Sequence, residues 1–105
     1  MMKIHFYLRF HTQFGQSLFV SGNCTELGNS DLEQAVPLQY LDNEFWHGSY
    51  EIDASSLSKL SYKYLLRNQD GFSVIEWGDD RYFEIAATNG LDEIQVVDTW
   101  NHAGE

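Results

Sequence analysis

Hydrophobic and polar positions alternate with a period of two along most of the chain. Between residues 3 and 11, the apolar side chains of Ile4, Phe6, Leu8 and Phe10 alternate with more polar ones. Successive side chains of a β-strand point to opposite faces of a sheet, so this pattern is typical of a half-buried strand. Similar patterns predict seven further strands, at residues 17–21, 36–41, 45–53, 60–67, 72–77, 81–85 and 94–100.

Turn residues separate these strands. Asp70-Gly71 lies between two alternating runs and predicts a hairpin, and Asn89-Gly90 predicts another turn. Pro37 cannot donate a backbone hydrogen bond, which places residues 36–41 at a sheet edge or at a strand start. Residues 23–34 are polar and read as a loop, and only residues 54–60 leave room for a helical turn. The expected fold is therefore all-β, an antiparallel β-sandwich of seven or eight strands.

Composition excludes several classes of partner. The 105 residues suffice for one domain, and 16 acidic against 6 basic side chains give a net charge of −10. Such a surface repels the phosphates of nucleic acids, so no nucleic-acid partner is expected. Apolar runs stay far below the roughly 20 residues that cross a bilayer, so no membrane partner is expected either.

Arg9 interrupts the N-terminal pattern where a signal peptide would be apolar, and the single cysteine, Cys24, suits a reducing compartment. The expected location is the cytoplasm.

The sequence contains neither the ligand spacing of a metal site nor a recognisable catalytic motif. The chain has 4 histidines and 1 cysteine without the spacing of a zinc site. His5 and His11 share one strand face but lie about 20 Å apart by the strand rise. Cys24 has Glu26 as a neighbour and no cation nearby that would lower the pKa of its thiol. Nucleophile-elbow and phosphate-loop motifs are missing from the sequence. We therefore expect no metal, no cofactor and no catalytic residue.

Aromatic residues supply the remaining signal. The chain has 3 Trp, 6 Tyr and 7 Phe, and many of them alternate inward on strands. Phe14 lies in a glycine turn, Trp46 follows a polar turn, and Trp77 precedes Gly78-Asp79-Asp80. Exposed flat rings beside polar side chains suit the binding of sugars, whose C–H faces stack on aromatics while their hydroxyls accept and donate hydrogen bonds. A core position is the alternative for Trp46, and local packing is the alternative for Trp77.

Several segments, taken in order, carry a family resemblance. They are FGQSLFVSG at residues 14–22, ELGN at 26–29, WHG at 46–48, YKY at 62–64, EWG at 76–78, DR at 80–81 and DTW at 98–100. Their order and spacing resemble the starch-binding domains, which are carbohydrate-binding modules of family 20. The resemblance implies an immunoglobulin-like β-sandwich over residues 1–101. Residues 102–105 would then be a tail, or the start of a linker to a following domain.

The resemblance implies two carbohydrate-binding sites. In the first site, Lys63 and Trp77 match the family pattern and Asp80 stands where the family has Asn. Ser30 occupies the position of a stacking Trp, and Gly78 replaces a Glu. The second site would comprise an aromatic-glycine turn and two rings from the neighbouring loop and strand. Its residues in this sequence are Phe14, Gly15, Tyr40 and Trp46.

Arg81 and Trp100 are expected outside both sites. Arg81 would bridge acidic neighbours rather than touch sugar, and Trp100 would be structural.

The implied function is non-catalytic binding of an α-1,4-glucan such as starch, glycogen or a malto-oligosaccharide. Because the sequence begins with Met1 and stops just after the last family motif, we expect it to form the N-terminal part of a longer enzyme. The family resemblance favours a cytosolic 4-α-glucanotransferase, with its catalytic domain in the same polypeptide. Two alternatives remain open: a related sandwich that has lost glycan affinity and serves as an interdomain or dimerisation module, and a small standalone enzyme.

Overall fold

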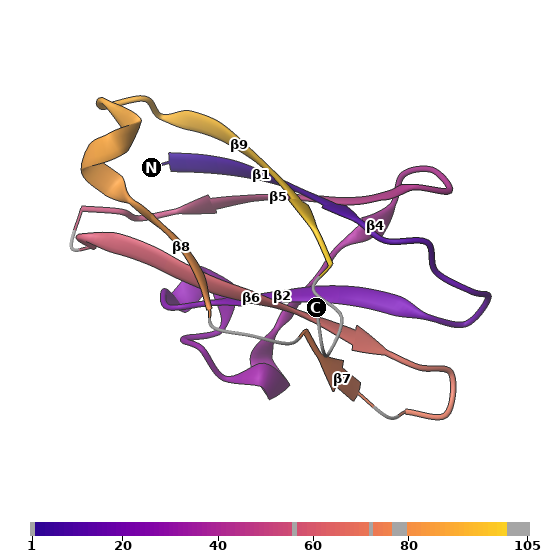
Figure 1. Cartoon of the computed structure of the whole chain (residues 1–105). Coiled ribbons are helices and arrows are strands. Elements are labelled where there is room, and N and C mark those ends of the chain that lie inside the picture. Colours follow the sequence, from indigo (N-terminus) through magenta and orange to yellow (C-terminus); the bar gives the residue numbers. More distant parts are fainter. Residues whose placement is uncertain (1, 56, 72, 77–79, 101–105) are drawn as a thin grey trace.

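The fold is that of a two-sheet sandwich, as the computed structural model shows for residues 2–55, 57–71, 73–76 and 80–100 (Figure 1). The strands are β1 (Met2–Arg9), β2 (Ser17–Gly22), β3 (Val36–Pro37), β4 (Gln39–Tyr40), β5 (Phe45–Ile52), β6 (Lys59–Arg67), β7 (Ser73–Ile75), β8 (Arg81–Glu84) and β9 (Glu93–Thr99). One sheet has the order β4-β5-β1-β9, and the other has the order β3-β2-β6-β7 with β8 also pairing with β6. The predicted all-β sandwich is confirmed.

One strand pair departs from the antiparallel expectation. β1 and β9 run parallel, with Lys3 opposite Glu93 and Arg9 opposite Thr99, whereas the other pairs are antiparallel within the described residues. The cause lies in the segment between β8 and β9, which returns the chain to the end of the sandwich where β1 begins. The backbone N–H of Lys3 donates to the carbonyl of Asp92 there, at 2.8 Å.

The predicted strand at residues 36–41 is divided between the two sheets. β3 pairs with β2 in one sheet, and β4 pairs with β5 in the other. Leu38, between them, is buried, and its N–H donates to the carbonyl of Leu18 at 2.8 Å. Pro37 lies at the sheet edge, where its missing N–H costs no ladder hydrogen bond. This division accounts for nine strands in the described chain instead of seven or eight.

The short helical turns lie elsewhere than predicted. In the range 54–60, the N–H of Leu57 donates to the carbonyl of Ala54 at 3.1 Å, and residues 59 and 60 already belong to β6. Two 3₁₀ helices, η1 (Thr25–Leu27) and η2 (Leu32–Gln34), instead occupy the predicted loop at residues 23–34. A third, η3 (Ile85–Thr88), follows β8. Side chains in the 23–34 segment reach the core, as the fully buried Leu27 shows, and this packing orders the loop.

The core consists of the inward-facing residues of both sheets. Ile4, Phe6 and Leu8 of β1 are fully buried, as the alternation predicts. On the facing sheet Tyr62 and Tyr64 of β6 are also buried, and Phe6 meets Tyr62 edge-to-face at 5.4 Å between ring centroids. These inward residues leave Ser61 and Lys63 of β6 on the outer face of the second sheet, where the first candidate site lies.

Candidate functional site

A hollow of about 230 Å³ lies on the outer face of β2 and β6. Its lining residues are Ser21, Ser30, Leu32, Ser61, Lys63, Ile75 and Asp80. Lys63 and Asp80, two predicted residues of the first site, form an ion pair at 3.5 Å. Three serines are among the residues that line the same hollow. The structure thus brings together a cation, a carboxylate and hydroxyl groups, which can donate to and accept from the hydroxyls of a sugar.

Ser30 is held at this hollow by an unusual backbone turn. Gly28, Asn29 and Ser30 all have left-handed backbone angles, with φ of 85°, 53° and 61°. The N–H of Ser30 donates to the carbonyl of Gly22 at 2.7 Å, which fixes the turn against the end of β2. A Cβ at position 28 would lie 2.5 Å from the carbonyl oxygen of Gln34, so only glycine fits there. The backbone at Ser30, where the resemblance places a stacking Trp, is therefore well fixed.

Trp77, the predicted stacking ring of the first site, lies outside the described residues, as do Gly78 and the predicted tail at residues 102–105. The residue before Trp77 is firmly placed. Glu76 is buried, and its carboxylate forms a two-pronged ion pair with the guanidinium of Arg81, each contact being 3.0 Å. Glu76 also accepts from the backbone N–H of Tyr64 at 3.3 Å. This anchor holds the end of the β7 segment against β6, the strand that carries Lys63.

Arg81 joins both sheets, which confirms that it bridges acidic neighbours. Its guanidinium also contacts the carboxylate of Asp98 on β9 at 3.3 Å and donates to the carbonyl of Thr99. The other oxygen of Asp98 accepts from the hydroxyls of Tyr62 and Tyr64 at 2.9 and 2.7 Å. Burial, followed by the negative charge of Asp98, raises the pKa of both phenols well above the ordinary tyrosine value.

Trp100 has the structural position that we predicted. It is buried in the core and packs edge-to-face against Phe10 at 5.2 Å between ring centroids.

The residues of the predicted second site differ in exposure. Phe14 is 96% exposed in a turn where Gly15 has φ of 89°, and Tyr40 is 60% exposed. Trp46 is only 8% exposed, and its indole N–H donates to the hydroxyl of Thr12 at 3.1 Å. Its ring meets that of Tyr40 edge-to-face at 5.8 Å. Trp46 thus supports Tyr40 from the core, whereas Phe14 and Tyr40 offer their rings to solvent.

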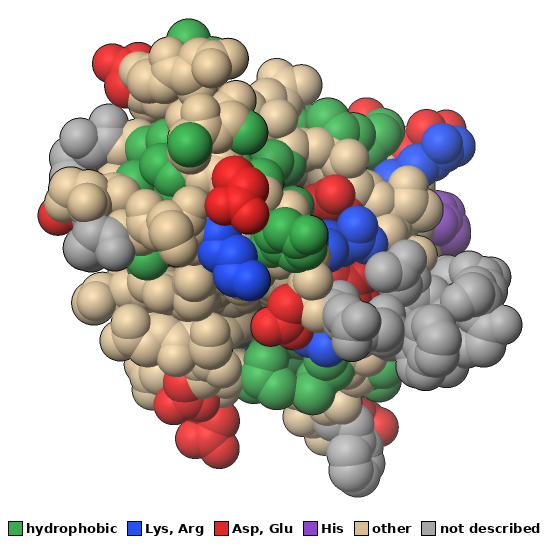
Figure 2. All heavy atoms as spheres, turned by 60° about the vertical axis from the view of Figure 1, so that its left-hand side comes forward, with side chains coloured by type: hydrophobic (Ala, Val, Ile, Leu, Met, Phe, Trp, Pro, Cys, Tyr) green, Lys and Arg blue, Asp and Glu red, His purple; other side chains and the backbone are tan. Residues whose placement is uncertain are grey.

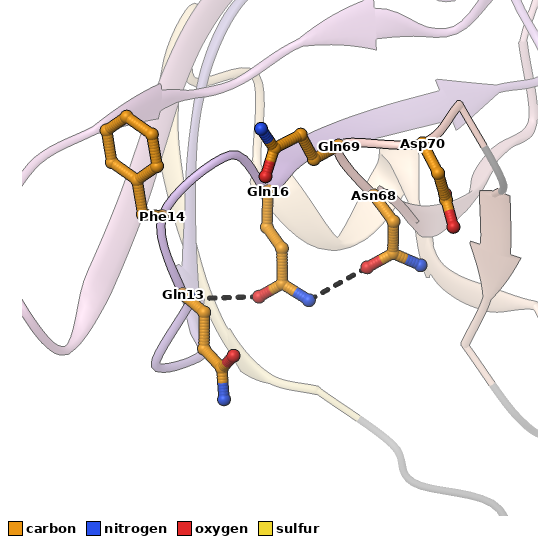
Figure 3. Close-up of a pocket in the computed structure, with 6 residues that line it drawn as sticks. All are labelled: Gln13, Phe14, Gln16, Asn68, Gln69 and Asp70. Carbon is orange, nitrogen blue, oxygen red and sulfur yellow. Dashed lines mark hydrogen bonds between the residues drawn. The ribbon is translucent and has the colours of Figure 1, made fainter.

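A second hollow, of about 430 Å³, contains residues that the sequence analysis missed. It lies between the turn that carries Phe14 and the β6–β7 hairpin loop (Figure 3). Its lining consists of Gln13, Phe14, Gln16, Asn68, Gln69 and Asp70. The hairpin is recognisable from Asp70-Gly71, but its proximity to the Phe14 turn depends on the pairing of β2 with β6.

Charge on the surface is mixed. On the face that Figure 2 shows, basic side chains lie beside acidic ones and do not gather into a basic patch. Within the described ranges, no group of three or more His, Cys, Asp and Glu side chains is arranged to hold a metal ion. None of the described helices is long and apolar enough to span a membrane.

Residues 1–95 match the sequence profile of the starch binding domain family, CBM_20. The chain belongs to this family. Among curated relatives, this starch-binding domain is 32% identical over 101 residues to glucoamylase-1 of Arthroderma benhamiae, covering 92% of the chain and 16% of the relative. It is 29% identical over 87 residues to the cyclomaltodextrin glucanotransferase of Bacillus sp. (strain 1-1), covering 81% of the chain and 12% of that enzyme.

Solved structures support the same fold. The Hypocrea jecorina family 15 glucoamylase superposes with a TM-score of 0.78 at 28% identity, over 95% of this chain and 17% of that one. The isolated family 20 module of a maltotetraose-forming amylase from Pseudomonas saccharophila superposes with a TM-score of 0.70 at 23% identity, over 94% of this chain and all of that one. The chain spans less than a fifth of the length of the curated relatives named above.

Proposed function

We propose that this starch-binding domain binds α-1,4-glucans and has no catalytic activity of its own. The observation that carries the proposal is the hollow on β2 and β6, where Lys63, Asp80 and the turn at Ser30 meet. Lys63 lies 33 residues after Ser30 in the sequence, and Asp80 lies 50 residues after it. By the family resemblance, all three positions belong to one site. A neutral sugar also suits a protein of net charge −10, because its binding needs no compensation of charge.

Isothermal titration with maltoheptaose and with β-cyclodextrin tests the proposal. We expect saturable binding of both ligands and no binding of a β-1,4-linked glucan oligomer of equal length, which serves as the matched control. Equal response to the two linkage types would contradict specific α-glucan binding. Absence of heat with either α-linked ligand at millimolar concentration would reject the function.

We further propose that the domain works within a longer cytoplasmic enzyme, a 4-α-glucanotransferase with its catalytic domain in the same polypeptide. Two observations support this proposal. The chain covers only 16% and 12% of the two relatives described above, and these relatives are named as a glucoamylase and a cyclomaltodextrin glucanotransferase. The buried thiol of Cys24 is compatible with a reducing compartment. The full-length protein should convert maltotriose into glucose and longer maltodextrins. Release of glucose alone would indicate a hydrolase instead, and cyclic products would indicate a cyclising transferase.

Ser30 favours a second candidate, an interdomain or dimerisation module without glycan affinity. The first site lacks one of the two rings expected there, so the surface could persist without its ligand. Light scattering across a range of protein concentrations, combined with the glucan titration, separates the two candidates. A dimer that does not bind α-glucans would support the second candidate, and a monomer that binds them would support the first.

A further inference from the structure

The hollow between residues 13–16 and 68–71 is polar and contains no positive charge. Four of its six lining residues carry side-chain amides, namely Gln13, Gln16, Asn68 and Gln69. An amide offers both a donor and an acceptor, which matches a sugar hydroxyl, since each hydroxyl also does both. None of the six lining residues is basic, so a phosphate or another anion is a poor fit.

The two loops are braced against each other by Gln16. Its side-chain oxygen accepts from the backbone N–H of Gln13 at 2.7 Å, and its side-chain nitrogen donates to the side-chain oxygen of Asn68 at 2.9 Å. Both ends of this amide are therefore engaged within the protein. Gln16 is thus a positioning residue that fixes the distance between the Phe14 turn and the hairpin loop, and such preorganisation lowers the entropic cost of binding.

Gly15 allows the loops to approach closely. A Cβ at this position would lie 2.9 Å from the Cβ and from the side-chain oxygen of Gln69, and the backbone has φ of +89°. The stem of Gln69 consequently lies against the backbone of Gly15. Gly15 of the Phe14-Gly15 pair thus has a second role, because it leaves room for the side chain of Gln69 from the hairpin loop.

Phe14 and Gln69 then reach to the same side of the paired loops, whereas Gln13, Gln16 and Asn68 point to the other (Figure 3). Phe14 is 96% exposed, and the side-chain amide of Gln69 makes no hydrogen bond to any residue that the structure describes. An exposed ring beside an amide with unused donor and acceptor positions is the pairing that a pyranose needs, with one group for its C–H face and the other for its hydroxyls.

We propose that Phe14 and the hairpin loop 68–71 form a binding subsite for a glucose unit of an α-glucan, with Phe14 stacking on the ring and Gln69 hydrogen-bonding its hydroxyls. The inference rests on the proposed α-glucan binding. It assigns Phe14 a partner from the hairpin loop. Gln69 is then a ligand-contacting residue, and the glucan crosses the end of the sandwich between two loops.

The first test compares Gln69→Ala with a matched variant, Gln95→Ala. Gln95 is an exposed glutamine on β9, which belongs to the other sheet, and it does not line the hollow. Titration with maltoheptaose and β-cyclodextrin should show about three- to tenfold weaker second-site binding for Gln69→Ala, the loss of one or two hydrogen bonds. Gln95→Ala should bind as the unchanged domain does. Phe14→Ala should weaken the same site further.

The second test detects the contact without altering the domain. In ¹⁵N-labelled protein, the side-chain amide signals of Gln69 should shift as β-cyclodextrin is added, whereas those of Gln95 should not. If the unchanged domain binds glucan, but Gln69→Ala binds equally well and the Gln69 signals stay in place, the subsite is wrong and glucan binding stands. If the unchanged domain binds no glucan, the proposed function fails and the subsite fails with it.

Discussion

At the scale of single residues, Ser30 stands where the proposed first site would need a second ring. The turn through Gly28 and Asn29 holds position 30 at the hollow beside Lys63 and Asp80, yet the serine offers no flat face to a sugar. The backbone there has φ of 61°, a left-handed conformation that costs a residue other than glycine about 1–2 kcal/mol. Serine already bears this backbone cost, so replacing it with a larger residue does not introduce the cost anew.

Ser30→Trp should therefore strengthen glucan binding. A stacked ring contributes ~1–3 kcal/mol on the scale measured for nucleobases, which corresponds to a gain of about five- to 150-fold in affinity. Isothermal titration with maltoheptaose measures the gain, and Ser30→Ala serves as the control, with affinity close to that of the unchanged domain. Unaltered affinity in Ser30→Trp would show that position 30 does not face the ligand.

Trp77 should account for the fluorescence response to sugar. The other two tryptophans, Trp46 and Trp100, are 8% and 6% exposed, so a ligand on the surface barely changes their surroundings. In Trp77→Phe, the change in emission on adding β-cyclodextrin should disappear, while binding measured by titration calorimetry persists with somewhat lower affinity. A retained fluorescence change would place the ligand near one of the buried indoles instead.

At the scale of elements, the ion-pair network of Arg81 joins β7, β8 and β9. The guanidinium faces two carboxylates, and the side chain of Glu76 is 1% exposed while that of Asp98 is 15% exposed. Removing one member of a buried pair leaves its partner charged and without compensation, which costs more than the pair itself stabilises.

Arg81→Met should lower the free energy of unfolding by about 3–5 kcal/mol. Urea denaturation followed by circular dichroism measures the loss. Arg9→Met is the matched control, because Arg9 meets Glu44 at 3.8 Å with both side chains more than half exposed, and such pairs contribute at most about 1 kcal/mol. Similar losses in the two variants would contradict a special role for the buried network.

Local alternation was sufficient to predict most strands, because β1, β5 and β6 each bury one face against a single core. It could not predict that residues 36–40 change sheets, since Leu38 is fixed by a hydrogen bond to the distant Leu18. The proximity of Lys63 and Asp80 was predictable from the order of the motifs. The amide hollow was not, because Gln16 and Asn68 meet only after β2 pairs with β6.

At the scale of the whole molecule, the phenols of Tyr62 and Tyr64 link stability to pH. Both have pKa values raised well above the ordinary value of about 10, because they are buried beside Asp98. The folded state therefore keeps these phenols protonated, whereas the unfolded chain releases their protons. Their contribution to stability is complete below the ordinary tyrosine pKa and decreases as the pH rises through it towards the raised values.

Stability should accordingly fall above about pH 10. Urea denaturation at a series of pH values measures the free energy of unfolding, and absorbance near 295 nm follows ionised tyrosine. The absorbance of Tyr62 and Tyr64 should rise only as the protein unfolds, because burial beside Asp98 raises the pKa of both phenols. Titration of every tyrosine in the folded state, with constant stability, would contradict the raised pKa values.

The parallel pairing of β1 and β9 has a mechanical consequence. The two strands lie side by side from Lys3–Glu93 to Arg9–Thr99 and run in the same direction, so residues 2 and 99 lie at opposite ends of this strand pair (Figure 1). Tension applied through residues 2 and 99 therefore acts along the strands. The load falls on all the hydrogen bonds between them at once, as a shear, instead of opening them one after another. In its proposed role within a longer enzyme, the domain would therefore meet such a pull as a shear between β1 and β9.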